Sequence, residues 1–550
     1  MTLPQKVQFR LAIGLLLVAA AVLFATAPRD GVFWWSDAPR HALNGVFLHD
    51  LVLAMPVRHL KQWAVDYYLQ YPALTIMFYP PLLAVGEMLS YFVFGISQAA
   101  AVAPVALANA GLGVAAFLLA RRWLPLWQAW AAGLLLAGLP EVALWARQPM
   151  TDVPAFALLA WSALFLLRHV ETARLRDLAA AAAFFVLGLY AKQSIAFLAP
   201  VVLLVLWQRH GLALLRQWRI WALAGAVVLA VLPLVAMTVL FGHGNVQSVV
   251  AIRDSHVSRL SLAGWLYYAR LLPQQAGWCV TVLAAIFVAG MLVRPRWRLG
   301  APGNWLLLGW LVAAYLFFSA IDLKDGRLDV AILLPVALFA VLAINRLLSE
   351  PWAEPWAEPW ADGAAILLAV LGLGYTLAFA PVPRVTGYRE AAAWIAANTP
   401  PDAVVAFSGQ RDGAFIFNLR TLDPDRRHTV IRADKLLLGI AIRRELGVVE
   451  KTADPAAIIA ALQRYGVSYV VAQQDFWTDL KPMAALQTAL GSDAFARVAT
   501  IPVTATIPHT DTELRLYRSL LPPPAKRAPL TVDLPIIGER FKADAAQKKP

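Results

Sequence analysis

Long apolar runs constrain this chain more than any other feature. Stretches long enough to cross a bilayer, roughly 17–25 residues each, recur along the first two-thirds of the sequence and end near Ala380. Hydrophobic residues fill 60% of the 550 positions and charged residues only 15%, whereas soluble proteins are usually about half apolar. The chain is therefore predicted to be a polytopic α-helical membrane protein.

About eleven membrane spans are predicted from apolar length. They cover 11–27, 99–120, 126–145, 150–167, 178–191, 194–208, 220–241, 276–293, 304–321, 329–345 and 363–380. If these spans alternate in direction, the basic segments all fall on one side, which the positive-inside rule makes cytoplasmic. These segments are Arg121-Arg122, 168–176, 209–219, 294–298 and Arg346. Counting the short apolar segment 80–94 as a span would break this agreement, so we expect a helix lying in the membrane interface there.

The N-terminal segment resembles a signal peptide, because Lys6 and Arg10 precede the apolar run 11–27. Pro28 directly after the small residues disfavours cleavage, and further spans follow. We therefore expect an uncleaved first span with a cytoplasmic N-terminus, in a bacterial-type inner (plasma) membrane. The first loop, about 28–98, and the chain after 381 are then extracytoplasmic.

Three function classes are disfavoured by composition. The net charge of +13 lies at the ends of apolar runs and forms no single basic stripe, so no nucleic-acid partner is expected. The single cysteine, Cys279, permits neither a disulfide framework nor a cysteine-based metal site. The sequence carries no phosphate-binding G-x-x-x-x-G-K-[ST] motif, which argues against an ATP-driven pump.

The pattern changes to that of a soluble α/β domain after Pro381. We predict a transmembrane module over 1–380, an extracytoplasmic domain over 381–521 and a mobile tail over 522–550. The predicted elements are a helix at Tyr388–Asn398 and strands at Ala403–Phe407, Thr429–Arg432, Ser468–Ala472, Ala496–Ile501 and Glu513–Tyr517. The repeated Pro-Trp-Ala-Glu stretch that begins at Pro351 is predicted to be a cytoplasmic linker.

The segment Phe33-Trp34-Trp35-Ser36-Asp37-Ala38-Pro39-Arg40-His41 follows the first span directly. One interpretation is structural: the tryptophans form an interfacial belt, Asp37 caps the next helix and Arg40 meets lipid phosphate. The other is that an acid and a base converge at the membrane surface to carry chemistry.

Motifs in a characteristic order favour the second interpretation. The sequence places Asp37 and Arg40 before His41, then Tyr79-Pro80-Pro81-Leu82, then Arg147, then Thr151-Asp152-Val153-Pro154, and then Ala191-Lys192. Over roughly residues 5–345 the chain resembles the GT-C superfamily of integral-membrane glycosyltransferases, in the branch of protein O-mannosyltransferases and the lipid A aminoarabinose transferase. The resemblance implies a GT-C-like fold, an essential carboxylate in the first loop and a sugar donor on a polyprenyl phosphate.

The resemblance assigns the catalytic carboxylate to Asp37, which could accept the proton of an acceptor hydroxyl. Asp152 is the second catalytic candidate, although it also reads as part of a helix cap. Candidates for binding the donor phosphate or substrate are Arg40, His41, Tyr79, Arg147, Lys192 and Arg327. Lys192 could instead snorkel to the interface, and Arg327 could be a solvated turn charge.

Two departures from the family pattern leave metal dependence open. Ala38 replaces an acidic residue often found beside the first-loop aspartate, and Phe78 and Tyr79 replace charged residues that often precede the Pro-Pro pair. No cofactor is certain, and a divalent metal is possible. His243, Asp254 and His256 could ligate one, but their spacing fits no compact motif.

We expect a glycosyltransferase of the cell envelope that moves a hexose or pentose from a polyprenyl-phosphate carrier to a lipid, glycan or protein. Transfer would occur at the outer face of the inner membrane. A transporter or flippase is the alternative, and it would need polar residues near the bilayer midplane. A third interpretation is an assembly or sensor protein whose spans serve only as an anchor.

Overall fold

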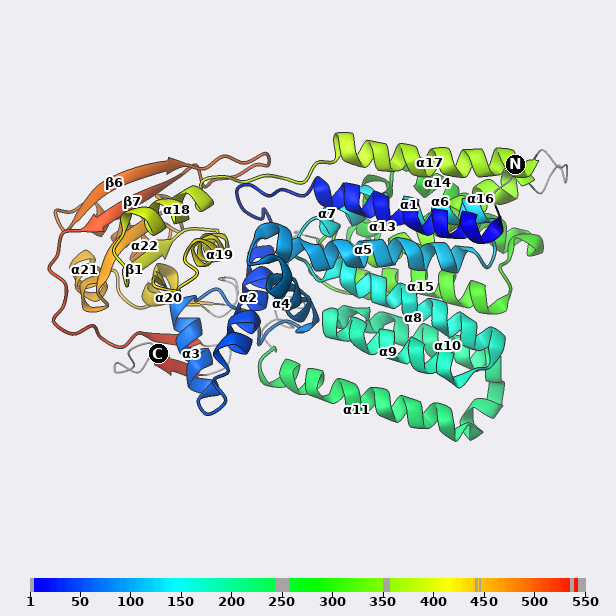
Figure 1. Ribbon diagram of the computed structural model, residues 1–550, viewed down its shortest axis with the longest axis horizontal. Coiled ribbons are helices and arrows are strands. Elements are labelled where there is room, and N and C mark those ends of the chain that lie inside the picture. Colours follow the sequence, from blue (N-terminus) through cyan, green and yellow to red (C-terminus); the bar gives the residue numbers. More distant parts are fainter. Residues whose placement is uncertain are drawn as a thin grey trace.

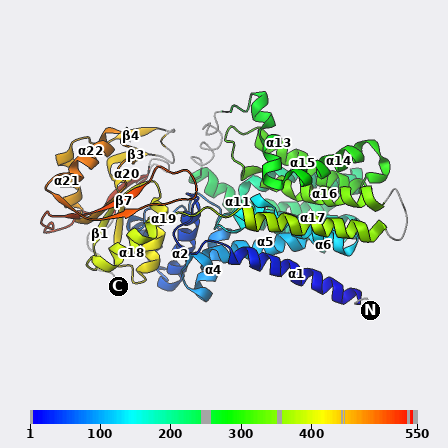
Figure 2. The same ribbon diagram turned by 90° about the horizontal axis from the view of Figure 1, so that it is seen from above.

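The chain folds into a bundle of long helices joined to a smaller α/β unit (Figure 1). The computed structural model describes residues 4–242, 257–349, 357–440, 444, 447–534 and 539–542. The N-terminus lies at the end of the bundle that is farthest from the α/β unit, and Figure 2 shows the same division from above.

Every one of the eleven predicted spans coincides with helical structure. Among the described residues, eight stretches have the length and hydropathy of a membrane span. They are α1 (Gln5–Ala25), α5 (Gln98–Ala120), α8 (Asp152–Thr172), α10 (Ala199–His210) with η1 (Gln193–Leu198) and η2 (Gly211–Arg216), α11 (Trp218–Leu240), α15 (Ala301–Ser319), α16 (Leu333–Ser349) with η4 (Leu328–Ile332), and α17 (Ala357–Phe379). The other three predictions fall on α9 (Leu175–Ala191), on α14 (Trp278–Val293) and on a bent pair of helices.

The bent pair consists of α6 (Leu126–Gly138) and α7 (Pro140–Ala146), whose axes meet at 61°. Leu139 adopts an extended conformation between the two helices, and Pro140 begins the second one. Proline lacks the backbone N–H that would continue the first helix and disfavours a helical residue before it. After the bend, α7 packs against α5, α8 and α17.

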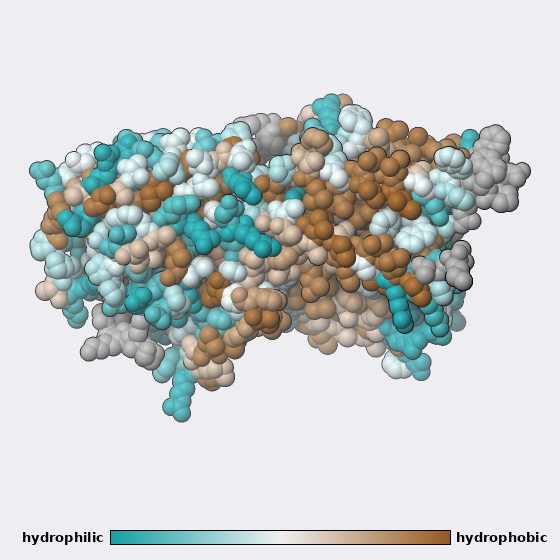
Figure 3. Space-filling view, turned by 45° about the horizontal axis from the view of Figure 1, so that its top comes forward, coloured by the Kyte–Doolittle hydropathy of each residue, from teal (hydrophilic) through white to brown (hydrophobic). Residues whose placement is uncertain are grey.

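The surface of the bundle is suited to lipid. Hydrophobic residues form a broad area over the bundle, whereas hydrophilic residues are more frequent over the α/β unit (Figure 3). On α11 the side chains of Leu229 and Val239 are 68% and 67% exposed, which would be unfavourable in water over so large an area. A polytopic membrane fold is thereby confirmed.

The first loop folds into α2 (Ala38–Ala54), α3 (Leu60–Gln70) and α4 (Leu82–Phe94). Figure 1 shows α2 running across the end of the bundle. Helix α4 packs between α2 and α5 and exposes Leu89, Val93 and Phe94 on its outer side. These exposed apolar side chains suit the predicted interfacial helix. The remaining helical elements near the bundle are α13 (Leu262–Ala276) and η3 (Pro295–Trp297).

The α/β unit is built on a five-stranded sheet with the order β2-β1-β5-β7-β6. Its strands are β1 (Val404–Ser408), β2 (Thr429–Arg432), β5 (Val467–Ala472), β6 (Phe495–Pro502) and β7 (Glu513–Ser519). β1 pairs in parallel with β2 and β5, whereas β7 pairs antiparallel with β5 and β6. All five predicted strands are present, within three residues at either end.

Helices cover both faces of this sheet. Val405 and Phe407 of β1 pack in one core with α18 (Tyr388–Asn398) and α19 (Asp412–Leu422), whereas Val404 and Ala406 pack in another with α21 (Pro455–Arg464) and α22 (Lys481–Leu490). Successive strand residues point to opposite faces, so this alternation follows from the apolar run of β1. A short helix, α20 (Ala433–Leu437), follows β2.

Two short hairpins were not predicted from the sequence. β3 (Leu438–Ile440) pairs with β4 (Val448–Glu450), and β8 (Thr531–Leu534) pairs with β9 (Glu539–Lys542). The second hairpin lies in the segment 522–550, whose mobility stays a prediction. Most of the Pro-Trp-Ala-Glu stretch lies outside the described residues.

Candidate active site

The predicted catalytic aspartate lies where the bundle, the first loop and the α/β unit meet. Asp37 occupies the N-cap position of α2, and Pro39 lies in the first turn. The carboxylate nevertheless accepts no capping hydrogen bond from the helix. The capping interpretation therefore fails to account for this side chain, which points instead to a cation supplied by another element.

That cation is Arg327, in the loop before η4. Its Nη1 lies 3.2 Å from Asp37 Oδ2, and its Nε donates to Asp325 Oδ2 at 3.1 Å. The guanidinium also lies 5.0 Å from the centre of the Trp35 ring. With two carboxylates and an aromatic face around it, Arg327 is held in a fixed direction and is no solvated turn charge.

The charge state of this pair follows from its surroundings. Burial alone would raise the pKa of Asp37, but the positive charges of Arg327 and Arg40 and the hydrogen bond from Arg327 outweigh burial and lower that pKa below its ordinary value. Burial opposes the charge on Arg327, whereas Asp37, Asp152 and Asp325 raise its pKa. Both groups are therefore ionised at neutral pH.

Two neutral groups lie beside the ion pair. The rings of His41 and Tyr79 are 4.7 Å apart. Burial lowers the pKa of His41 to about 4, although Asp37 partly offsets the effect. Burial and the negative charge of Asp37 raise the pKa of Tyr79 well above its ordinary value. At neutral pH, His41 is therefore uncharged and Tyr79 keeps its proton.

A second ion pair joins Asp152 and Lys192. Asp152 is the first residue of α8 and is fully buried, and Lys192 follows the last residue of α9. Lys192 Nζ donates to Asp152 Oδ1, while Asp152 Oδ2 has no hydrogen-bond partner among the described residues. The charges of both residues act on His41, and that of Asp152 also acts on Arg327. The structure thus brings Asp37, His41, Tyr79, Asp152, Lys192 and Arg327 together.

Two other predicted phosphate ligands make different contacts. Arg40 pairs with Asp412 of α19, with 2.7 Å between Nη2 and Oδ1. Arg147 is buried and donates to the carbonyl oxygens of Ala143 and Ala380 and to the Thr26 hydroxyl, at 2.9, 3.0 and 3.2 Å. Arg147 thereby joins the ends of α7, α17 and α1. The phosphate roles of Arg40 and Arg147 stay predictions that these contacts do not favour.

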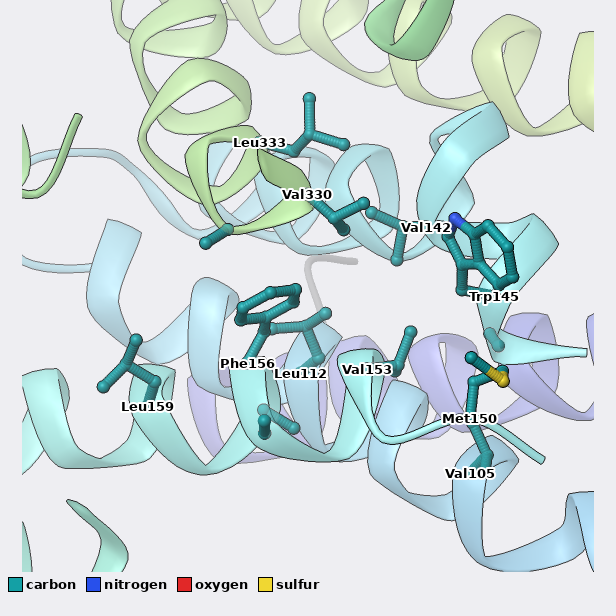
Figure 4. Close-up of a cluster of buried hydrophobic side chains, with 14 of the residues drawn as sticks. Val105, Leu112, Val142, Trp145, Met150, Val153, Phe156, Leu159, Val330 and Leu333 are labelled. Atoms are coloured by element: carbon teal, nitrogen blue, oxygen red, sulfur yellow. The ribbon is translucent and has the colours of Figure 1, made fainter. Parts of the chain in front are cut away.

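Several neighbours of the site were not selected from the sequence. Trp34, Trp35 and Trp145 form an aromatic cluster with ring centres 5.1–5.7 Å apart. Trp145 donates to Glu141 at 2.7 Å. Figure 4 shows Trp145 beside Val142, at one side of an apolar cluster that also includes Val153 and Phe156. The Trp34-Trp35 pair beside Asp37 can be recognised in the sequence. Trp145 lies more than 100 positions away, and only the fold brings it to this pair.

The described residues give no support to a metal centre. They contain no group of three or more His, Cys, Asp or Glu side chains arranged to hold an ion. His243, Asp254 and His256, the candidate ligands, lie outside the described residues.

Comparisons with known proteins agree with this architecture. Residues 79–237 match the sequence profile of the family described as dolichyl-phosphate-mannose-protein mannosyltransferase. A search of curated proteins gave no match. ArnT from Cupriavidus metallidurans in the apo state is similar with a TM-score of 0.60 at 15% identity, over 92% of this chain and 97% of that chain.

Two further structures show the same likeness. ArnT from Cupriavidus metallidurans bound to undecaprenyl phosphate has a TM-score of 0.58 at 15% identity, again over 92% of this chain and 97% of that chain. The apo oligosaccharyltransferase of Archaeoglobus fulgidus has a TM-score of 0.57 at 13% identity, over 88% of this chain and 71% of that chain. The GT-C-like fold expected from the sequence is confirmed.

Proposed function

We propose that this GT-C-fold chain is a glycosyltransferase that moves a sugar from a polyprenyl-phosphate carrier to an acceptor. The observation that carries the proposal is the Asp37 carboxylate, which is ionised, makes no capping hydrogen bond to α2 and pairs with the half-buried Arg327. The similar ArnT structure, which is bound to undecaprenyl phosphate, supports a carrier of this class. We place transfer at the outer face of a bacterial-type inner membrane, with a hexose or pentose as the sugar and a lipid, glycan or protein as the acceptor.

Each ionised group has a role in such a transfer. The acceptor oxygen forms a bond to the anomeric carbon while the bond from that carbon to the phosphate oxygen breaks. The acceptor proton passes to Asp37, and the bonding electrons leave with the phosphate. Arg327 and Lys192 would stabilise the charge that develops on the leaving phosphate.

The resting ion pairs suggest how the carrier phosphate enters. Lys192 can exchange the carboxylate of Asp152 for a phosphate oxygen, because its flexible ammonium has three donors. Arg327 has five N–H donors and can keep its bond to Asp325 while it turns another donor toward the phosphate. Asp152 would then hold Lys192 in place when no carrier is bound.

A transporter is less well supported. Substrate sites of transporters lie near the bilayer midplane, between discontinuous helices. Among the described spanning helices, the buried charged residues lie near helix ends, as with Asp152 at the start of α8 and Asp177 in the first turn of α9. Charged side chains at helix ends lie near the membrane surfaces and away from the midplane site that a transporter needs.

Replacing Asp37 by asparagine tests the proposal. Asn keeps the shape and suits an N-cap position, but it is a far poorer base, so transfer should fall roughly 10²- to 10⁴-fold. The measurement is sugar transfer from a polyprenyl-phosphate-linked sugar by purified wild type and variant of matched thermal stability. Asp30→Asn is the control, because this residue lies in the same loop with its side chain 68% exposed. Transfer near the wild-type rate by Asp37→Asn would remove the assignment.

A further inference from the structure

Two consecutive residues of the α/β unit contact the loop that carries Asp37, one on each side of it. Arg411 Nη1 donates to the carbonyl oxygen of Trp34 at 2.8 Å. Asp412 Oδ1 accepts from Arg40 at 2.7 Å. Trp34 and Arg40 each lie three positions from Asp37. The loop is therefore held at both ends by residues that are more than 370 positions away in the sequence.

Both contacting residues are themselves fixed. Arg411 Nε donates to Asp511 Oδ2 at 2.9 Å, and Asp511 is fully buried and also accepts from the Tyr388 hydroxyl at 2.8 Å. Arg411 therefore has little freedom to move away from Trp34.

Asp412 is held in a similar way. Its second oxygen lies 2.6 Å from Nη1 of Arg432, which in turn pairs with Asp434. The Asp434 pairing means that Arg432 would keep one carboxylate partner if Asp412 lost its charge.

Backbone packing keeps these side chains close to the loop. A Cβ atom added to Gly413 would lie 3.2 Å from Cγ of Arg40 and 3.3 Å from Cγ of Pro39. Glycine thus permits the close approach of α19 to α2. The first turn of α19 and the first turn of α2 form one rigid contact.

We propose that Arg411 and Asp412 are positioning residues that hold the Asp37 carboxylate in line with Arg327, so that the α/β unit completes the catalytic site. This inference rests on the proposed role of Asp37. Catalytic groups must be held to within about half an ångström, and a displacement of about 1 Å can cost roughly a hundredfold in rate. In this proposal the α/β unit holds the loop that carries Asp37 in position and supplies no group that reacts with the substrate.

Two conservative substitutions separate positioning from stability. Arg411→Lys can keep a charged partner for Asp511 but loses the fork that also reaches Trp34. Asp412→Asn keeps the side-chain shape and removes the charge that holds Arg40, while Arg432 retains Asp434. Arg384→Gln is the matched control, because Arg384 joins the same α/β unit to the same loop at Asp30, with 3.6 Å between the charged atoms, away from Asp37.

The first measurement is amide hydrogen exchange over residues 33–41 of the full chain in lipid nanodiscs, which needs no substrate. We expect faster exchange in Arg411→Lys and Asp412→Asn and wild-type exchange in Arg384→Gln. The second is sugar transfer from a polyprenyl-phosphate-linked sugar, for which we expect kcat to fall about 10- to 100-fold with KM for the carrier within about twofold of wild type. A merely structural role would lower the melting temperature but leave both the amide exchange over residues 33–41 and kcat at their wild-type values.

A double substitution shows whether Asp412 acts through Arg40. If it does, Asp412→Asn should cost no further activity in an Arg40→Gln background, because the contact is already lost. Additive losses would overturn that part of the proposal. Unchanged exchange and unchanged kcat in both single variants would overturn all of it. An inactive Asp37→Asn protein beside fully active Arg411→Lys and Asp412→Asn proteins refutes the positioning role alone, whereas an active Asp37→Asn protein refutes the proposed function.

Discussion

At the scale of single residues, the candidate site is built from ion pairs between residues that lie far apart in the chain. Asp37 and Arg327 are 290 positions apart, and Arg40 and Asp412 are 372 apart. Such pairings depend on tertiary structure, and the spacing of motifs along the sequence carries no information about them. Arg147 illustrates the consequence, because a cation beside a motif looks the same in sequence whether it binds phosphate or backbone carbonyls.

Because Lys192 pairs with Asp152, replacing Lys192 should affect the stability of the fold as well as carrier binding. From the sequence, Lys192→Ala should weaken carrier binding more than protein accumulation. In the folded chain the substitution also leaves Asp152 buried and unpaired, and breaking a buried pair from one side typically costs about 3–5 kcal/mol. We therefore expect a clear loss of thermal stability as well.

The double variant Asp152→Asn with Lys192→Met separates the two effects. It removes both charges together, so thermal stability should recover toward wild type while binding of undecaprenyl phosphate to the purified protein stays weak. Thermal unfolding and equilibrium binding of this lipid phosphate are the two measurements. If binding recovered together with stability, the phosphate role of Lys192 would be lost and its pairing would be structural.

At the scale of elements, periodicity and apolar length located the helices and strands well. The helix Tyr388–Asn398 was predicted to the residue, because amphipathic spacing with a glycine before it is a strong local signal. The bend between α6 and α7, the two hairpins and the helices α19, α20, α21 and α22 were missed. A single proline, Pro140, within an apolar run does not determine the angle of the bend. Strands of three or four residues have too few positions to show alternating apolar and polar side chains.

The connection between α19 and β2 shows how a short element ties the first loop to the α/β unit. Gln70 of α3 donates to the carbonyl oxygens of Arg426 and His428, at 2.6 and 2.9 Å. Asp423 accepts from the backbone N–H of His428 at 2.7 Å and contacts its ring nitrogen at 2.8 Å. Asp423 thus shapes the turn that α3 binds.

Asp423→Asn should destabilise this connection in a pH-dependent way. Burial would raise the pKa of Asp423, but the hydrogen bonds from His428 lower it to about 2. A depressed pKa means that the ionised group stabilises the fold above its ordinary value of 3.8 and that this contribution is lost as pH falls through about 2. We expect a loss of about 1–3 kcal/mol at pH 7.

Thermal unfolding of the full chain at several pH values checks the Asp423 prediction. The difference in unfolding free energy between wild type and Asp423→Asn should shrink as pH falls below 4, toward the Asp423 pKa of about 2 in the folded chain. Asp425→Asn is the control, because that side chain lies in the same connection and is 74% exposed. A difference that is independent of pH would mean that shape, rather than charge, explains the effect.

At the scale of the whole molecule, the fold and the charge pattern give one consistent orientation. The N-terminus lies at the end of the bundle away from the α/β unit (Figure 1). The basic segments at 121–122, 168–176 and 294–298 lie at or directly after the C-terminal ends of α5, α8 and α14. An alternating path places these ends on the side of the N-terminus, as the predicted topology requires.

Reporter fusions decide which side of the membrane each end occupies. Because basic residues favour the cytoplasmic side, an alkaline phosphatase fused after Thr386 should be active and a cytoplasmic reporter fused there inactive. A fusion after Arg346, at the basic end of α16, should give the reverse pattern and serves as the matched control. The same phosphatase activity at both positions would mean that α17 does not cross the membrane. Reversed activities at both would place Asp37 on the cytoplasmic face, where the proposed transfer at the outer surface could not occur.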